Sequence, residues 1–471
     1  MAARPPTAKP ALLWYRRDLR VADNPALDAA VRSGRPVVPV YILDDTEGAA
    51  GRWWLHHSLA ALSGDLRRLG APLVLRRGGA QKELLRLITE TGAEAVYWNR
   101  EYTPAAITRD TTLKEALKQR GITAESFNAA LLHEPWTVKT GGGTPFKVFT
   151  PFWNAIRARG EPTPTLPAPK SIPGHDIAGD TLDDWNLLPS KPDWAAGFRE
   201  NWRPGETSAL ARLDDFLSHE LLGYAAKRDI PALPATSRLS PYLHYGEIGP
   251  RQVWRAATLR AATHPELASD AGKFLSELAW REFSWHLLFS EPELPANNLR
   301  PNFDAFPWAQ DAKALKAWQL GRTGYPIVDA GMRELWHTGW VHNRVRMIVA
   351  SFLVKHLLIH WREGAAWFMD TLVDADLANN SASWQWVAGC GADAAPYFRI
   401  FNPVLQGQKF DAQGTYVRRW IPELTAVPDK WVHQPWAAPQ PPGGYPAPIV
   451  DHRFARDRAL TAFASIGRAA A

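Results

Sequence analysis

Residues 374–408, DADLANNSASWQWVAGCGADAAPYFRIFNPVLQGQ, are the part of this sequence that says most about its fold and its function. Asp376, Asn380 and Trp384 are spaced four apart, so on a helix they lie along one face. Trp384 and Trp386 are two apart, about 200° around a helix axis, and point to different surroundings. A carboxylate, an amide and an indole on one face suit a polar aromatic ligand, although a Trp-rich helix packed in a core would show the same pattern.

The composition indicates a folded protein with more than one domain. The chain has 471 residues, of which 46% are hydrophobic and 22% charged, as is ordinary for a soluble globular protein. Trp is unusually frequent, with 23 copies, and 11 of them lie between Trp254 and Trp386. Indoles at this density build aromatic cores, and they also serve as stacking surfaces and electron relays.

Charge and cysteine content exclude several kinds of site. The net charge is +6, from 54 basic and 48 acidic residues, so a nucleic-acid site has to be a local patch. The single cysteine, Cys390, excludes a disulfide framework, a cysteine-based zinc site and a cysteine-ligated iron–sulfur cluster, and we expect no metal. The N-terminus lacks an apolar signal segment, and no window has the roughly 18 apolar residues of a membrane span. We therefore expect a cytoplasmic protein that does not contact a membrane.

The first 135 residues alternate short apolar runs with helical patterns. Strands are predicted at 12–15, 37–43, 73–75, 95–98 and 123–127. The intervals between them, such as 53–69 and 104–120, carry apolar residues at helical spacing. This alternation predicts an α/β domain with a doubly wound parallel sheet and helices on both faces. No GxGxxG motif follows the first strand, so a dinucleotide site in this domain is not supported.

The rest of the chain reads as a linker and a second, larger domain. Eight prolines and little periodicity mark residues 161–205 as a long connection. Beyond Thr207 the pattern is helical, with stripes at 209–226, 274–288, 314–319, 328–336 and 341–360. We predict an α/β domain over 1–135, a linker over 136–205 and an all-helical domain over 206–471.

Residues 236–241, TSRLSP, place hydroxyl groups at the start of a helix with Pro241 in its first turn. Unpaired N–H groups and the positive end of the helix dipole favour a phosphate at such a start. An ordinary capped helix would look the same, so this motif becomes informative only beside others.

Two longer motifs accompany it. WYRRDLR at 14–20 and YFRIFNP at 397–403 resemble signatures of the cryptochrome/photolyase family, and the resemblance extends over nearly the whole chain, as far as Trp436. It implies FAD in the all-helical domain, with Asn380 facing flavin N5, where an amide serves as donor or acceptor. Arg346 would pair with Asp374 near the ring, which an ordinary buried ion pair would also explain. The cofactor-binding residues that the resemblance implies are Tyr224, Thr236, Ser237, Arg238, Leu239, Ser240, Arg346, Asp374, Ala375, Asp376 and Asn380.

The resemblance also implies a cavity over the flavin that takes a flipped-out dipyrimidine from UV-damaged DNA. Glu277 and Trp280 are three apart and Asn343 and Met347 four apart, so each pair shares a helix face. Stacking on indoles and a hydrogen bond to a base edge suit an extruded base. The implied catalytic residues are Glu277, Trp280, Asn343, Met347 and Trp386. The implied DNA-binding residues are Glu277, Trp280, Arg281, Asn343, Arg344 and Gln406, although surface charge explains each arginine taken singly.

Three tryptophans, Trp384, Trp361 and Trp308, align with the family's electron relay from the surface to an oxidised flavin. For each tryptophan taken singly, packing in a hydrophobic core is the alternative explanation. The antenna chromophore is left open, with methenyltetrahydrofolate favoured. Folate-binding members have an Asn-Glu pair where this sequence has Ala105 and Ala106, so a deazaflavin, a second flavin or an empty site stays open.

The resemblance predicts a DNA photolyase that splits cyclobutane pyrimidine dimers in UV-damaged DNA with reduced FAD and blue light, acting as a monomer. Family members that repair the (6-4) photoproduct need two histidines over the flavin, and the matching positions here are Asn343 and Met347. Neither side chain can deliver a proton at neutral pH. The alternative is a cryptochrome-like blue-light photoreceptor without repair activity.

Overall fold

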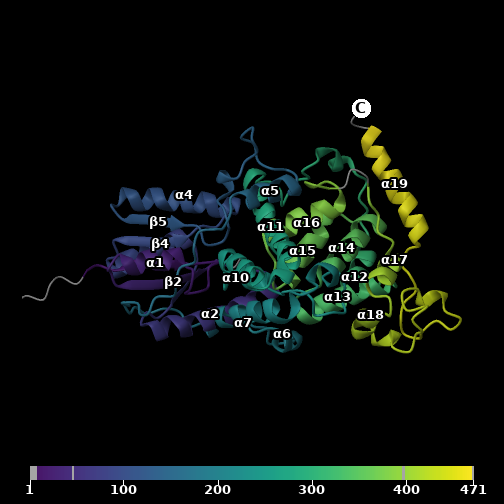
Figure 1. Ribbon diagram of the computed structural model, residues 1–471, viewed down its shortest axis with the longest axis horizontal. Coiled ribbons are helices and arrows are strands. Elements are labelled where there is room, and N and C mark those ends of the chain that lie inside the picture. The colour runs from purple at the N-terminus through teal and green to yellow at the C-terminus, as the bar shows by residue number, and fades with distance from the viewer. Residues whose placement is uncertain (1–7, 45–46, 395–397, 469–471) are drawn as a thin grey trace, which may run out of the picture.

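The computed structural model describes residues 8–44, 47–394 and 398–468, and it places a sheet at one end of the molecule and helices at the other (Figure 1). Strands and helices alternate in the N-terminal part, as predicted. Its elements are β1 (Ala11–Tyr15), α1 (Pro25–Arg32), β2 (Val37–Leu43), α2 (Ala49–Leu69), β3 (Val74–Arg77), α3 (Ala80–Thr91), β4 (Ala95–Asn99), α4 (Pro104–Gln119) and β5 (Thr123–Phe127).

The five strands form one parallel sheet in the order β3-β2-β1-β4-β5, so the chain winds outward from β1 in both directions. This confirms the predicted doubly wound sheet. Helices cover both faces: Leu13 and Tyr15 of β1 pack in a core with α1 and α2, whereas Leu12 and Trp14 pack with α3 and α4. β1, β2 and β4 are buried throughout, and strands buried on both faces have uninterrupted apolar sequences. The apolar runs in the sequence therefore predicted these strands.

The segment predicted as a linker, 136–205, contains more helix than its prolines suggested. It holds α5 (Phe149–Ala158), α6 (Ala196–Asn201) and the 3₁₀ turn Asp183–Trp185, and the 3₁₀ turn Pro135–Thr137 lies across its start. Its irregular part runs along the sheet, where the Val37 N–H donates to the Pro173 carbonyl (2.7 Å) and the Asp180 N–H donates to the Leu75 carbonyl of edge strand β3 (2.9 Å). The segment therefore covers groups that an edge strand would otherwise expose.

The remaining described residues are predominantly helical, as predicted. An isolated β-bridge between Ala309 and Ile359 joins two extended segments among them. The α-helices are α7 (Glu206–Asp215), α8 (Tyr224–Lys227), α9 (Ser240–Tyr245), α10 (Pro250–Thr263), α11 (Ala268–Ser290), α12 (Ala312–Gln319), α13 (Pro326–Thr338), α14 (Asn343–Ser351), α15 (Trp361–Thr371), α16 (Leu377–Ala388), α17 (Pro403–Phe410), α18 (Thr415–Trp420) and α19 (His452–Arg468). Short 3₁₀ turns lie at Pro265–Leu267, Pro301–Ala305, Pro422–Leu424 and Pro435–Ala437, and π-helical turns at Phe216–Glu220 and Phe352–His356.

Two predicted helical stripes are interrupted. The stripe 341–360 is α14 followed by the π-helical turn Phe352–His356, and the chain then leaves the helix at Leu358, whose φ is +55°. The stripe 209–226 is divided by Gly223, whose φ is +82°. The apolar spacing continues through both breaks, so periodicity alone did not reveal them.

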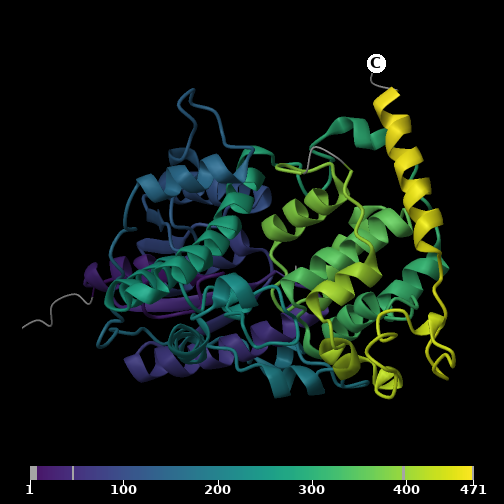
Figure 2. The ribbon, with the colours of Figure 1, turned by 45° about the vertical axis from the view of Figure 1, so that its right-hand side comes forward.

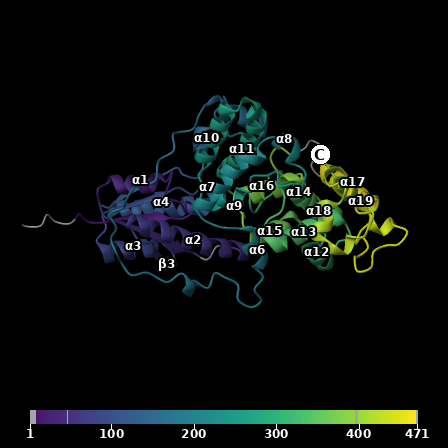
Figure 3. The same cartoon turned by 60° about the horizontal axis from the view of Figure 1, so that its bottom comes forward.

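One hydrophobic cluster joins the sheet part to α9, α10 and α11 of the helical part, whereas α14 and α15 pack in a second cluster. Trp54 of α2 packs edge-on against Trp202 and Tyr242, and its Nε1 donates to Glu247 (3.1 Å). Arg20, just after β1, donates to the carbonyl of Gly246 at the end of α9 (2.8 Å). In Figure 3, α9 and α16 lie near the middle of the molecule, and Figure 2 shows α19 along the outer edge of the helical part. Over the described ranges, no helix has the length and hydropathy needed to cross a membrane.

Candidate active site

The predicted phosphate motif does begin a helix. α9 starts at Ser240 with Pro241 in its first turn, and within the described residues no side chain caps it. The Arg212 guanidinium fixes the preceding loop by donating hydrogen bonds to the carbonyl of Ser237 (2.9 Å) and that of Thr236 (3.5 Å). The carbonyls of Thr236 and Ser237 are thus occupied, while N–H groups at the helix start remain for a ligand.

Arg238 has the most unusual backbone of this loop, with φ at +52°. Its guanidinium lies between two indoles, 4.4 Å from the ring of Trp202 and 5.0 Å from that of Trp340. Nε of Arg238 is buried without a hydrogen-bond partner, and burial lowers the pKa of this arginine. Arg238 is half-buried, and a partly desolvated cation with an unused donor suits an anionic ligand group such as a phosphate.

Trp340, which the sequence did not single out, connects the two halves of the predicted cofactor site. Its Nε1 donates to Oγ of Ser240 (3.3 Å), and the Arg346 guanidinium lies 5.8 Å from its ring. It follows Gly339, which ends α13 with φ at +68°. The Gly339-Trp340 pair directly after a predicted helix is the feature of the sequence that could have pointed to Trp340.

Arg346 and Asp374 form the predicted ion pair, with NH2 2.8 Å from Oδ2. Nε of Arg346 donates to the carbonyl of Val341 (2.8 Å), which fixes the side chain. The other carboxylate oxygen, Oδ1 of Asp374, is buried and has no partner. Because buried carboxylate oxygens are normally paired, this atom calls for a ligand with an N–H or O–H donor.

Asp376 caps α16, the helix of the Asn380–Trp384 stripe. Its Oδ1 accepts from the Asn379 N–H (2.8 Å), and its Oδ2 accepts from Nε1 of Trp285 (3.1 Å). Burial raises the pKa of Asp376, but His244 of α9 and Arg281 outweigh it and hold the pKa at about 2. The carboxylate is therefore ionised at neutral pH and ties α9 to α16.

Four further cofactor candidates are buried or half-buried. Nδ2 of Asn380 donates to the carbonyl of Ala365 (3.0 Å), which leaves Oδ1 and one N–H for a ligand. Ala375 and Leu239 are buried, and Tyr224 is buried against Phe274. Trp340 thus links Arg238 and Ser240 to the Arg346–Asp374 pair, whereas the place of Tyr224 in the cofactor site stays a prediction.

This set of groups fits FAD. The unpaired Nε of Arg238 and the free start of α9 supply donors for a phosphate, and the unpaired Oδ1 of Asp374 supplies an acceptor. FAD also needs an aromatic surface beside these polar groups, and Trp340 supplies one. No group of three or more His, Cys, Asp or Glu that could hold a metal ion occurs among the residues the structure describes.

α11 carries one wall of the predicted lesion cavity. Glu277 accepts hydrogen bonds from Arg228 and from Nζ of Lys273 (2.8 Å), so its carboxylate is already paired. Trp280 is half-buried, and its ring stacks on Phe149 of α5 with centroids 3.7 Å apart and planes 8° apart. Arg281 donates to the carbonyl of Ala130 (2.9 Å), within the protein, and its role in DNA binding stays a prediction.

α14 carries a second wall. Asn343 is exposed at its first position, and Met347 is half-buried one turn later. Arg344 pairs with Asp229 (2.6 Å), and one of its nitrogens lies 3.8 Å from Sδ of Met347. His342 is the N-cap: its Nδ1 accepts from the Arg344 N–H (3.1 Å), and burial lowers its pKa to about 4.

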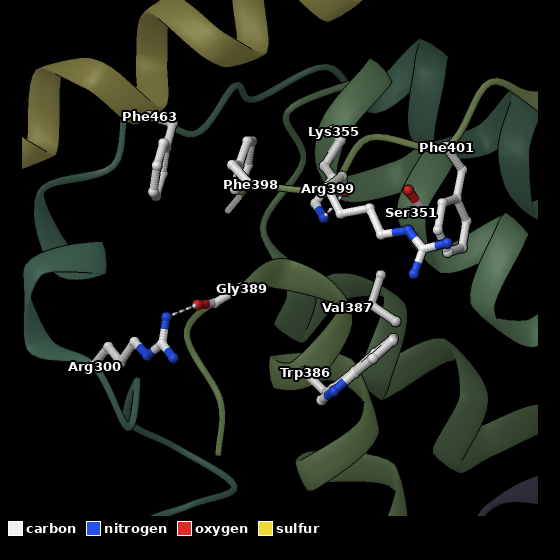
Figure 4. A pocket seen from close by; sticks show the side chains of 10 residues that line it. All are labelled: Arg300, Ser351, Lys355, Trp386, Val387, Gly389, Phe398, Arg399, Phe401 and Phe463. Carbon is white, nitrogen blue, oxygen red and sulfur yellow. Dashed lines mark hydrogen bonds between the residues drawn. The ribbon is translucent and has the colours of Figure 1, made fainter. Parts of the chain in front are cut away.

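Trp386 stands on α16 at the edge of a pocket that also has cationic side chains. Figure 4 shows Trp386 and Val387 facing Lys355 and Arg399 across it. The Arg399 guanidinium lies 5.0 Å from the ring of Phe401, and burial lowers the pKa of Lys355 to about 7. Sequence reasoning placed neither cation in the site. Gln406 is half-buried on α17, and Tyr397 of the predicted signature lies outside the described residues.

The three relay candidates lie on touching elements. Trp384 and Trp361 are buried in one hydrophobic cluster, and Trp308 is half-buried beside it. The Ala309 N–H donates to the carbonyl of Leu358 (2.7 Å), which brings Trp308 to the chain just before Trp361. The His360 ring lies 4.8 Å from Trp308 and 5.5 Å from Trp361. This order from buried to partly exposed is the one that a relay would need.

Family models match both parts of the chain. A model described as DNA photolyase matches residues 11–170, and one described as the FAD binding domain of DNA photolyase matches residues 274–465. A deoxyribodipyrimidine photo-lyase of Agrobacterium fabrum is 52% identical over 97% of this chain and 98% of its own. Cryptochrome-1 of Arabidopsis thaliana is 40% identical over 93% of this chain and 68% of its own.

Solved structures of similar proteins have the same fold. A bacterial class III photolyase from Agrobacterium tumefaciens has a TM-score of 0.96 and 52% identity, covering 99% of both chains. An archaeal photolyase from Sulfolobus tokodaii, solved with two FAD molecules, has a TM-score of 0.83 and 30% identity over 97% of this chain and 99% of its own.

Proposed function

Because the chain belongs to the cryptochrome/photolyase family, we propose that it is a DNA photolyase that repairs cyclobutane pyrimidine dimers under blue light. Reduced FAD, when bound, supplies the electron that opens the dimer. The protein's own part is to hold the cofactor and the lesion against each other, as is usual in cofactor chemistry.

The observation that carries the choice of lesion is the start of α14. Asn343 and Met347 stand where the (6-4) enzymes of the family have histidines, and neither is a proton donor at neutral pH. His342 offers no substitute, because it is buried, accepts the Arg344 N–H through Nδ1 and has a pKa of about 4. A cyclobutane dimer needs no proton transfer to split, only contact, stacking and an electron.

Each group of residues has a proposed role. Arg238, Ser240 and the free N–H groups of α9 hold the phosphates, while Asp374 and Asn380 hold polar atoms of the flavin ring. Trp280 and Trp386 stack on the extruded bases. Glu277 accepts a hydrogen bond from a base edge, which requires it to loosen its contact with Arg228. Arg281, Arg344 and Gln406 contact the DNA backbone around the lesion.

The alternative, a cryptochrome-like photoreceptor without repair activity, has less support. The plant cryptochromes among the relatives are less similar than the bacterial photolyase, with 40% against 52% identity. A plasmid irradiated with UV light separates the two functions. Treatment with the protein under blue light, and not in the dark, is expected to restore its transformation of bacteria; equal transformation in light and dark would contradict repair.

The antenna is a separate proposal. Methenyltetrahydrofolate stays the favoured chromophore, although Ala105 and Ala106 at the start of α4 offer it no hydrogen-bonding side chain. We also propose that the protein acts as a monomer. An absorption spectrum of the purified protein, before and after removal of FAD, would identify any second chromophore.

A further inference from the structure

The guanidinium of Arg238 is held by aromatic rings and by no carboxylate. It lies over two indoles, 4.4 Å from the ring of Trp202 and 5.0 Å from that of Trp340. Among the described residues, none binds this guanidinium through an ion pair or a hydrogen bond, and its Nε is buried. An indole attracts a cation through the face of its ring and occupies none of the guanidinium N–H groups. Both the charge and the donors of Arg238 therefore stay available for a ligand.

Trp202 comes from the segment predicted as a linker, and the end of α13 fixes its indole. It directly follows α6 and is 4% exposed. Its Nε1 donates a hydrogen bond to the carbonyl of Thr338 (2.7 Å), and Oγ1 of Thr338 accepts one from the backbone N–H of Trp340 (3.1 Å). One residue, Thr338, is thus bound to both of the tryptophans that lie beside Arg238.

α6 approaches this end of α13 so closely that only glycine fits at two positions. A Cβ at Gly197 of α6 would overlap the carbonyl oxygen of His337, and a Cβ at Gly339 would lie 2.6 Å from the ring of Phe198. The carbonyl of Phe198 also accepts a hydrogen bond from the backbone N–H of Trp202 (2.9 Å). This close packing fixes the position of Trp202 relative to the turn that carries Trp340.

Other contacts join Trp202 and the residues after it to the sheet part and to α9. Trp54 of α2 packs edge-on against the Trp202 indole, with ring centroids 5.4 Å apart. One carboxylate oxygen of Glu247 accepts from Nε1 of Trp54 (3.1 Å), and the other accepts from the Gly205 N–H (2.6 Å). The hydroxyl of Tyr242 in α9 donates to the carbonyl of Arg203 (3.2 Å). The segment that presents the Trp202 ring to Arg238 is therefore held from several directions.

We infer that Trp202 is a positioning residue that holds the Arg238 guanidinium where it meets the phosphate groups of FAD. This inference rests on the proposed function, in which Arg238 contacts those phosphates. A carboxylate in the place of Trp202 would also hold the guanidinium, but it would compete with the phosphates for the charge and the N–H donors. The ring face holds the cation without that competition. The affinity for FAD therefore depends on the ring of Trp202 and not only on its apolar bulk.

The test compares two substitutions of Trp202 that differ mainly in the ring. Trp202→Phe and Trp202→Leu introduce side chains of comparable volume, and both lose the hydrogen bond to Thr338, but only phenylalanine offers a ring face to a cation. The same two substitutions of Trp185 are the matched control, because Trp185 is also 4% exposed and its ring packs on Tyr41 of β2 (6.1 Å). The measured quantity is the dissociation constant of FAD from the whole chain, obtained by equilibrium dialysis.

We expect Trp202→Leu to bind FAD about tenfold more weakly than Trp202→Phe, on the scale of one partly desolvated cation–π contact. Trp185→Leu and Trp185→Phe should bind FAD equally. In an Arg238→Gln background, Trp202→Leu and Trp202→Phe should also bind FAD equally, because the cation on which the ring acts is gone. If Trp202→Leu does not fold, Trp202→Met takes its place as the variant without a ring.

Three results would overturn the inference. Equal affinity of Trp202→Leu and Trp202→Phe for FAD would show that the ring face is not used. An equally large difference between the two Trp185 variants would show a general effect of losing a buried ring. A tenfold difference that persists in the Arg238→Gln background would show that Trp202 acts by another route.

Failure of the proposed function gives a different result. If Arg238→Gln alone leaves the FAD affinity unchanged, Arg238 does not contact the phosphates, and the inference falls with that proposed role. If Arg238→Gln weakens FAD binding while Trp202→Leu and Trp202→Phe bind equally, the role of Arg238 stands and only the inference about Trp202 is overturned.

Discussion

Gly364 lies directly against the indole of Trp384: a Cβ built on Gly364 would stand 2.1 Å from Cη2 of that ring. Gly364 is in the first turn of α15, which Trp361 begins, and Trp384 is on α16. The absence of a side chain at this position thus lets the two helices approach until the middle and inner tryptophans of the proposed relay share one packed cluster.

Replacing Gly364 by Ala should destabilise the protein by about 1–3 kcal/mol, because the added methyl group overpacks the contact with Trp384. The measurement is thermal unfolding. Gly272→Ala is the matched control, since Gly272 is also inside a helix but its Cβ would meet nothing within 4 Å. That variant should be unchanged or stabilised by up to about 1 kcal/mol. Equal melting temperatures for the two variants would contradict the packing described here.

Replacing Trp361 by Phe should stop the light-driven reduction of oxidised FAD, because the proposed relay loses its middle member. Repair by chemically reduced protein should survive, since Trp361 is buried and is not among the residues proposed to contact the lesion. Trp254→Phe provides a control, because its indole is also buried but lies in a different hydrophobic cluster. The flavin spectrum under illumination is the readout, and unchanged photoreduction in Trp361→Phe would remove this residue from the relay.

Arg344 should contribute to DNA binding only after it leaves Asp229, with which it is paired at 2.6 Å. We expect Asp229→Asn to strengthen DNA binding, because the guanidinium no longer has to give up a carboxylate. Arg344→Ala should weaken it and reduce the slope of log affinity against log salt by about one. Fluorescence titrations at several salt concentrations measure both effects. If Asp229→Asn binds no better than the unaltered protein, Arg344 does not contact phosphate.

The burial of His342 predicts a pH-dependent stability. Burial lowers its folded pKa from 6.5 to about 4, so between these values the unfolded chain binds a proton that the folded protein does not. Its contribution is therefore fully present above pH 6.5 and is lost as the pH falls toward 4, to a total of about 3 kcal/mol.

His342→Asn keeps a side-chain cap for α14 and removes the titration, so denaturant unfolding at pH 7 and pH 4.5 should differ less than in the unaltered protein. His219, which is exposed, provides the control as His219→Asn. An unchanged pH dependence in His342→Asn would show that His342 titrates normally in the folded protein.

The fold was predictable where one physical cause dominates the sequence. Val37–Leu43 is buried on both faces of a parallel sheet, so its apolar run has no interruption. The end of the helical stripe at Leu358 was not predictable, because it depends on a distant segment of the chain. The Leu358 carbonyl accepts a hydrogen bond from the Ala309 N–H. Local spacing contains no information about such a partner.

The same limit applies to the candidate site. Helical spacing predicted that Glu277 and Trp280 share a face of α11, and the ion pair of Arg346 with Asp374 followed from the family resemblance. The stack of Phe149 on Trp280 joins the predicted linker to α11, and no periodicity connects the two. Trp340 was missed for a related reason, since its importance lies in contacts with Arg238 and Arg346 rather than in its neighbours along the chain.

The central claim, repair of cyclobutane dimers, is tested most directly by product analysis. Protein with chemically reduced FAD is illuminated with blue light in the presence of an oligonucleotide that bears a cyclobutane thymine dimer or, separately, one that bears the (6-4) photoproduct. Chromatography of the digested oligonucleotides is expected to show restored thymines from the first substrate and none from the second, because Asn343 and Met347 supply contact but no proton. Conversion of the (6-4) photoproduct with no conversion of the cyclobutane dimer would contradict the assignment.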